Sequence, residues 1–212
     1  MSNQENNLKR ILRISIILFV AASSASAQSS GDQSRPGLKL DVLIDGKQFS
    51  INDGDTIRHD SKTIVVRSSK YMTFDYEALS FDFPKHFSYS LDQAEGYKTW
   101  TLDGAEFIIM YFVLDVEVGM DILVKEMIEK FGKKNCTLSD RRTRLGDLDL
   151  PGKRINITLV GVKLTYDIFT LNTNDGKTHF LAFQDTKGDD GSESQEGLET
   201  LDVLSKTIKL KE

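Results

Sequence analysis

The sequence is poor in cysteine, proline and histidine. Of 212 residues, one is cysteine, three are proline and three are histidine. A single cysteine, Cys136, excludes an intrachain disulfide, so stability has to come from a hydrophobic core. The scarcity of proline argues against a stiff, proline-rich linker. His59, His86 and His179 are scattered and offer no close pair of the kind that zinc sites commonly use, so we expect no metal site.

The sequence also lacks an excess of positive charge and the common catalytic motifs. Its 27 basic and 32 acidic residues leave a net charge of −5, which argues against nucleic acid as a partner. It contains no Gly-x-Ser-x-Gly turn and no glycine-rich phosphate loop. We therefore expect no catalytic residue and no cofactor. A Ser-His-Asp arrangement that forms only in the folded chain stays open as an alternative.

The N-terminal segment is typical of a secretory signal peptide. Three basic residues precede a short apolar stretch at 14–22, and a small-x-small cleavage site ends at Ala27. A stretch of nine residues is too short for a membrane span, which needs about 20 apolar residues. We expect cleavage of residues 1–27 between Ala27 and Gln28, a secreted or periplasmic protein, and no stable membrane span after cleavage.

An exported chain places its single cysteine in an oxidising compartment. Cys136 then has three possible roles: a small buried hydrophobic residue without reactivity, a partner in an intermolecular disulfide, or a nucleophile. No histidine lies near Cys136 in the sequence, although a catalytic partner could come from a distant position.

The chain after the signal peptide divides into three parts. Residues 28–37 are polar and lack periodicity, which predicts a disordered leader. Residues 38–70 read as a β-hairpin extension, because Leu40, Val42 and Ile44 alternate with polar residues up to an Asp45-Gly46 turn. Residues 71–212 contain the remaining apolar segments and form the main domain.

The main domain is predicted to be α+β, with helices packed on an antiparallel sheet. One apolar stripe at helical spacing predicts a helix at 120–131, and a second predicts a helix at 198–208. The apolar run at 106–116 predicts a central strand covered on both faces. Two or three long strands within residues 154–185 are expected at the centre of the same sheet, and both helices are expected to cover it.

Residues 74–210 resemble the superfamily of the photosystem extrinsic protein PsbP and the bacterial periplasmic DcrB-like proteins. The resemblance rests on LSFDFPKHF at 79–87, YDIFTLNTNDGKTHFLAF at 166–183 and LDVLSKTIKLKE at 201–212. The family has a tryptophan shortly after the proline of the first motif, whereas this sequence has His86-Phe87. The resemblance implies an α/β/α sandwich in a family that mostly binds partners or assists assembly, and it implies no catalytic residues.

Two charged segments are candidates for binding. The loop at 187–197, KGDDGSESQEG, offers carboxylates, but its spacing does not match a calcium-binding loop, so we expect a solvated loop and keep weak calcium binding as the alternative. Six basic residues lie within residues 130–144 of an acidic protein. Five of them form a candidate docking patch for an anionic surface or an acidic partner: Lys133, Lys134, Arg141, Arg142 and Arg144.

These observations favour an exported, non-catalytic binding or assembly module of the bacterial cell envelope. Its expected partner is an envelope protein or an anionic surface. The alternative is a secreted hydrolase whose active site lies in a cleft of the sheet.

The basic patch yields the first prediction. Replacing Arg141, Arg142 and Arg144 together by glutamate reverses three charges, each of which contributes about 1 kcal/mol near an anionic surface. Sedimentation with anionic liposomes or with the envelope fraction is expected to fall to background. Unchanged sedimentation of the triple variant would contradict a docking role for the patch.

Overall fold

The computed structural model describes residues 39–211, which divide into two compact units at residues 39–70 and 71–211. Each unit is described by itself. The predicted signal peptide and leader lie outside the described residues. In the described part of the chain, no helix is long and apolar enough to cross a membrane.

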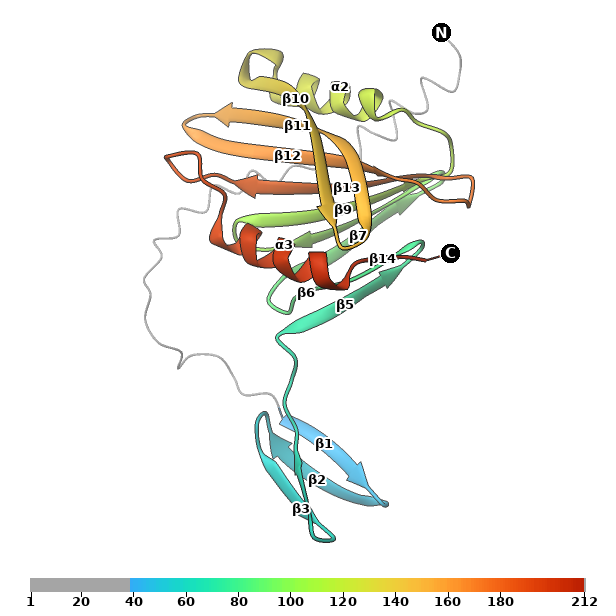
Figure 1. The fold of residues 1–212 in the computed structure, drawn as a ribbon, viewed down its shortest axis with the longest axis vertical. Helices are drawn as coiled ribbons and strands as arrows, with labels where there is room; N and C mark the ends of the chain where they lie inside the picture. The colour runs from blue at the N-terminus through green and yellow to red at the C-terminus, as the bar shows by residue number, and fades with distance from the viewer. Residues whose placement is uncertain (1–38, 212) are drawn as a thin grey trace. The chain divides into compact units, whose positions relative to one another are not determined.

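The smaller unit consists of two antiparallel hairpins (Figure 1). The four strands are β1 (Lys39–Ile44), β2 (Lys47–Asn52), β3 (Thr56–His59) and β4 (Lys62–Val65). Asp45 and Gly46 have φ angles of 49° and 78°, the left-handed values that a tight two-residue hairpin turn requires. The predicted hairpin at Asp45-Gly46 is therefore confirmed, whereas β3 was not predicted, because its four residues carry too little periodicity.

The larger unit is built on a seven-stranded antiparallel sheet, in the order β10-β11-β12-β13-β9-β8-β7. Its strands are β7 (Ser88–Ala94), β8 (Tyr97–Asp103), β9 (Phe107–Leu114), β10 (Cys136–Leu145), β11 (Leu148–Leu159), β12 (Val162–Leu171) and β13 (Thr178–Thr186). The predicted central position of residues 154–185 is confirmed, because β13 is the fourth strand of seven. The apolar run predicted as a central strand is β9, directly beside β13.

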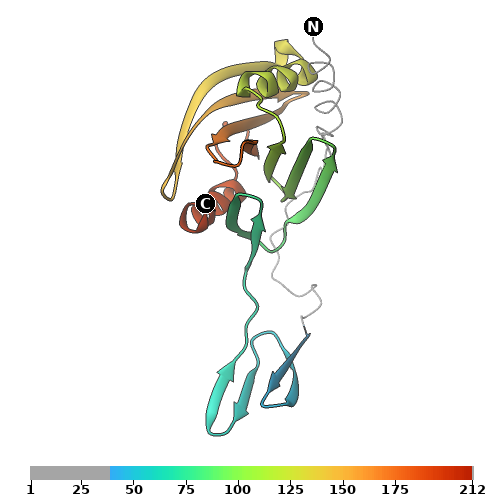
Figure 2. The same cartoon turned by 90° about the vertical axis from the view of Figure 1, so that its right-hand side faces the viewer.

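Both faces of the central strands of this sheet are buried, and one helix packs on each face (Figures 1 and 2). Successive side chains of β9 alternate between the two cores: Tyr111 faces one core and Phe112 the other. Helix α2 (Met120–Phe131) packs its apolar stripe on the Phe112 side. Helix α3 (Gln195–Thr207) packs Leu204 into the Tyr111 side.

A separate three-stranded sheet shares the α3 side of the larger unit. It consists of β5 (Tyr71–Tyr76), β6 (Leu79–Pro84) and β14 (Lys209–Leu210), in the order β14-β6-β5. Phe74, Leu79, Phe81 and Phe83 point from this small sheet into the same core as Tyr111. The expectation of one sheet for the main domain was wrong, because β5 and β6 pack face to face on the large sheet instead of pairing along its edge.

Local sequence explains where the two helices begin and end. Helix α2 spans the predicted residues 120–131 and stops before Gly132, which has a φ of 85°. Helix α3 begins three residues earlier than predicted, because the Ser194 hydroxyl accepts a hydrogen bond from the backbone N–H of Gly197 and caps the first turn.

The packing of α3 yields the second prediction. Leu204 is fully buried, whereas Leu198 on the same helix is 48% exposed. Leu204→Ala leaves a cavity between α3 and the sheets and is expected to lower the free energy of unfolding by about 2–5 kcal/mol. Leu198→Ala is the matched control, with an expected change of about 0.5 kcal/mol or less. Urea unfolding, monitored through the fluorescence of Trp100, measures both changes, and equal losses would contradict the packing described.

Candidate functional site

An apolar groove lies where the small sheet meets one end of the large sheet. Its volume is about 370 Å³. Strands β5, β6, β7 and β8 provide its walls. The lining residues are Met72, Thr73, Phe74, Tyr76, Phe83, Tyr89, Ser90, Leu91, Trp100 and Leu102. None of them is acidic, basic, histidine or cysteine, so the groove is suited to binding apolar groups and offers no acid–base pair.

The alternation of side chains along the strands produces the groove. On β7, Leu91 stands opposite Trp100 of β8, so both side chains lie on the face that the small sheet partly covers. On β5, Met72 and Tyr76 lie on the same face as the buried Phe74. Four apolar side chains at the rim stay exposed because the small sheet does not extend over β7: Met72, Tyr76, Tyr89 and Leu91.

Packed aromatic rings form the base of the groove. The rings of Tyr76 and Trp100 stack with centroids 5.6 Å apart, and Trp100 stacks on Tyr111 at 5.5 Å. Phe74 packs edge-on against both Trp100 and Tyr111, at 5.9 Å from each. Rings held in this way lose little conformational freedom when a ligand binds, so the groove floor is preorganised.

Two sheet edges border the groove, and each carries a single charged residue, Asp75 on β5 and Asp92 on β7. Among the described residues, β7 pairs with β8 alone and β5 with β6 alone. Neither strand contains lysine, arginine, proline or glycine, the residues that commonly block an exposed edge. The opposite edge of the large sheet differs, because β10 contains three arginines. The contrast indicates that the groove side is open to a further strand.

The predicted basic residues do not share one face. Lys133 and Lys134 lie exposed on a single turn of 3-10 helix, η1 (Lys133–Asn135). Arg141 points to the opposite face of β10 from its neighbour Arg142, and its Nε lies 3.4 Å from Asp167 Oδ2.

Arg142 and Arg144 have partners of their own. Arg142 makes a two-pronged ion pair with Asp149 on the neighbouring strand. Arg144 donates to the carbonyl of Gly146 at 3.2 Å. The charges therefore protect the β10 edge, and a docking role for them stays a prediction. Lys133→Glu together with Lys134→Glu tests that role without breaking these ion pairs.

Basic side chains form ion pairs with the acidic loop and with the aspartate that precedes it. Glu193 of the loop lies 3.5 Å from both Arg154 and Lys187, and Lys187 donates to Asp185 at 2.8 Å. Asp185 also accepts a 2.5 Å hydrogen bond from the hydroxyl of Ser194, the residue that caps α3. Two of the carboxylates that a calcium ion would need are therefore already paired.

Each histidine lies beside a carboxylate, but no histidine lines the groove. His179 is fully buried, with Nδ1 2.7 Å from the Tyr111 hydroxyl and Nε2 2.9 Å from Asp175 Oδ2. Burial raises the pKa of Tyr111 above its ordinary value. The order Tyr-His-Asp resembles a catalytic triad. However, Tyr111 and His179 are both 0% exposed, so a substrate cannot reach the tyrosine or the histidine.

His86 anchors the start of α3 through Glu196. One Glu196 oxygen lies 2.7 Å from His86 Nε2, and the other accepts the backbone N–H groups of Glu106 and Phe107 at 2.6 and 2.9 Å. Burial alone would raise the pKa of Glu196, but these backbone hydrogen bonds and His86 together lower it below the ordinary value of 4.5. The carboxylate thus links α3 to the turn between β8 and β9.

Cys136 is half-buried at the start of β10, and it packs against the core beneath α2. Burial raises the pKa of its thiol above the ordinary value, which disfavours the reactive thiolate.

No family model and no curated protein matches the sequence. A similar solved structure is that of a Bacteroides thetaiotaomicron protein, determined at 1.50 Å resolution. It is 14% identical, with a TM-score of 0.41, and the match covers 68% of this chain and half of that protein. A likeness of this size does not establish a shared fold.

Glu196 yields the third prediction. A lowered pKa in the folded state stabilises the fold above the ordinary pKa of 4.5, and this stabilisation is lost as the pH falls through the folded-state value. Glu196→Gln is expected to lower the free energy of unfolding by about 1–2 kcal/mol at pH 7. The difference from the parent protein should shrink below pH 4.5.

The matched control is Glu199→Gln, an exposed position on the same helix. It is expected to change stability by about 0.5 kcal/mol or less at any pH. Urea unfolding between pH 3 and pH 7 measures both variants. A constant difference across this range would contradict the role assigned to the Glu196 carboxylate.

Proposed function

We propose that this protein is an exported, non-catalytic binding or assembly module of the bacterial cell envelope, and that its groove binds an extended, apolar stretch of polypeptide. The observation that carries the proposal is the groove of about 370 Å³ between the edge strands β5 and β7, neither of which contains lysine, arginine, proline or glycine. Its apolar lining favours binding over catalysis.

The edges favour a polypeptide as the ligand. Strand β7 has seven residues, so it can align with a partner strand over about 23 Å at roughly 3.3 Å per residue. In such an added strand, every second side chain would point into the groove, toward Trp100, Leu91 and Tyr89. Backbone hydrogen bonds would then supply affinity, and the groove would select apolar residues at alternate positions.

Two expectations from the sequence support the proposed location in the cell envelope and the proposed binding role. The predicted signal peptide at 1–27 would place the protein outside the cytoplasm, where unfolded or extended segments of other exported proteins are available. The resemblance to PsbP-like and DcrB-like proteins implies an α/β/α sandwich with a role in binding or assembly. A helix on each face of the large sheet is consistent with that sandwich.

The hydrolase alternative has less support. A hydrolytic site needs a nucleophile or an activated water beside a base that substrate can reach. Among the described residues, the groove brings no such base together with a nucleophile. In the Tyr111–His179–Asp175 network, both Tyr111 and His179 are fully buried.

The groove yields the fourth prediction. The probe is a soluble peptide of alternating valine and threonine, as long as β7, with lysines at its ends. Binding is followed through the fluorescence of Trp100, the single tryptophan of the chain, which lines the groove. Leu91→Lys places a charge in the groove and is expected to weaken binding at least tenfold, about 1.4 kcal/mol.

The control variant is Leu138→Lys on β10. Leu138 is 48% exposed and Leu91 is 47% exposed, but Leu138 lies on the opposite edge strand. The Leu138→Lys variant should bind the peptide as the parent protein does. A peptide that is N-methylated at every residue has no amide hydrogen to donate to β7, so it should bind more weakly. Equal binding of the methylated peptide would contradict strand addition, and equal loss in both lysine variants would contradict the groove as the site.

A further inference from the structure

The smaller unit has too little core to be stable by burial alone. Of its 32 residues from Lys39 to Lys70, only Ile57 is buried. The two hairpins form separate two-stranded sheets, and this part of the chain contains no cysteine. Units below about 40 residues usually need a disulfide, a metal ion or oligomerisation in addition to their core.

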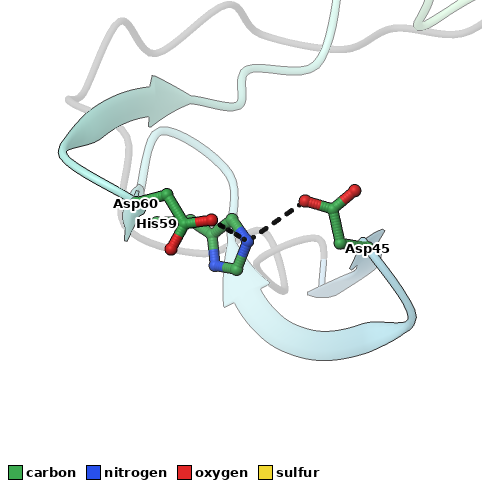
Figure 3. Close-up of side chains that lie close together, drawn as sticks. All are labelled: Asp45, His59 and Asp60. Atoms are coloured by element: carbon green, nitrogen blue, oxygen red, sulfur yellow. Dashed lines mark hydrogen bonds and ion pairs between the residues drawn. The ribbon is translucent and has the colours of Figure 1, made fainter.

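The tips of the two hairpins meet at a cluster of three potential metal ligands (Figure 3). Asp45 belongs to the turn between β1 and β2, and His59 and Asp60 lie at the turn between β3 and β4. Nε2 of His59 is 3.3 Å from Asp45 Oδ2 and 3.5 Å from Asp60 Oδ2. The three ligand atoms all lie within 4.8 Å of one another, and this is the one such cluster in residues 39–211.

Backbone and packing hold the three groups in place. Asp45 and Asp60 have φ angles of 49° and 45°, because each occupies the first position of a tight hairpin turn. The imidazole of His59 packs edge-on against Phe49, with ring centroids 5.9 Å apart, and its side chain is only 20% exposed. The two carboxylates, in contrast, are open to solvent.

The two carboxylates place like charges around one nitrogen atom. A single Nε2 can donate one hydrogen to one acceptor, so it cannot satisfy both aspartates. Two negative groups this close repel each other unless a cation lies between them. A divalent cation would accept all three ligand atoms at once.

We propose that Asp45, His59 and Asp60 bind a zinc ion that clamps the two hairpins together. In a tetrahedral zinc site with bonds of about 2.1 Å, neighbouring ligand atoms lie about 3.4 Å apart. The two nitrogen–oxygen separations, 3.3 and 3.5 Å, match this spacing. One imidazole nitrogen among three ligands favours zinc over calcium, which prefers oxygen ligands throughout. Water would occupy the fourth position, since both aspartates face solvent.

The proposed zinc site departs from the expectation, drawn from the sequence, of no metal site. The sequence shows no close pair of histidines. The ligand that sequence reasoning missed is Asp45, which lies in a turn fourteen residues before His59. The signal that could have revealed it is the pairing of two hairpin turns that both carry aspartate, Asp45-Gly46 and Asp60-Ser61, with a histidine beside the second.

The fifth prediction tests the site by calorimetric titration of the full chain with zinc chloride. We expect one saturable site per chain, which is lost in His59→Ala and at least tenfold weaker in Asp60→Asn. Asp41→Asn is the matched control, because Asp41 lies on the same first hairpin and loses the same charge but is outside the cluster. It should bind zinc as the parent protein does.

A second readout separates loss of a ligand from loss of the fold. Amide hydrogen exchange of residues 39–70 should slow when zinc is added to the parent protein and to Asp41→Asn. It should not change in Asp60→Asn at the same zinc concentration, while residues 71–211 exchange equally in all samples. Absence of saturable binding up to ~1 mM zinc, or unchanged binding in His59→Ala and Asp60→Asn, would overturn the proposal.

Discussion

The pairing of β9 with β13 is the interaction on which the larger unit depends. These strands are more than sixty residues apart in the sequence, yet they align from Phe107 opposite Asp185 to Leu114 opposite Thr178. This pairing joins the hairpins that precede α2 to those that follow it. Both strands are buried on both faces, so each contributes to the two cores at once. Closing such a long loop is costly in entropy, and burial on both faces of the sheet offsets that cost.

The groove follows from unequal coverage of this sheet. The small sheet and α3 bury one face of the central strands, but the small sheet stops short of β7. Apolar side chains such as Tyr89 and Leu91 therefore stay exposed beside the buried Trp100. The other edge, β10, carries arginines with nearby partners, so its charges resist pairing with another chain. The two edges of the large sheet thus differ: β7 is proposed to bind a partner strand, and the charges of β10 disfavour pairing with one.

The two units differ in what stabilises their folds. The larger unit has two cores and needs no cross-link, in agreement with the single cysteine of the chain. The smaller unit buries Ile57 alone, and its hairpin tips are held by Asp45, His59 and Asp60. A metal clamp there would replace the core that 32 residues cannot build. The groove and the clamp are independent proposals, since they lie in different units and involve different residues.

The sequence by itself determined the elements whose signals are local. The α+β class, the Asp45-Gly46 turn, the helix at Met120–Phe131 and the central position of β9 and β13 depend on periodicity and turn chemistry within a few residues. The tertiary structure alone decided that β5 and β6 form a second sheet and that their aromatic side chains meet Trp100. It also decided that Asp45 lies beside His59 and that Glu196 lies beside His86. Such contacts join residues far apart in the chain, and no local pattern encodes the distance between two strands that meet only after folding.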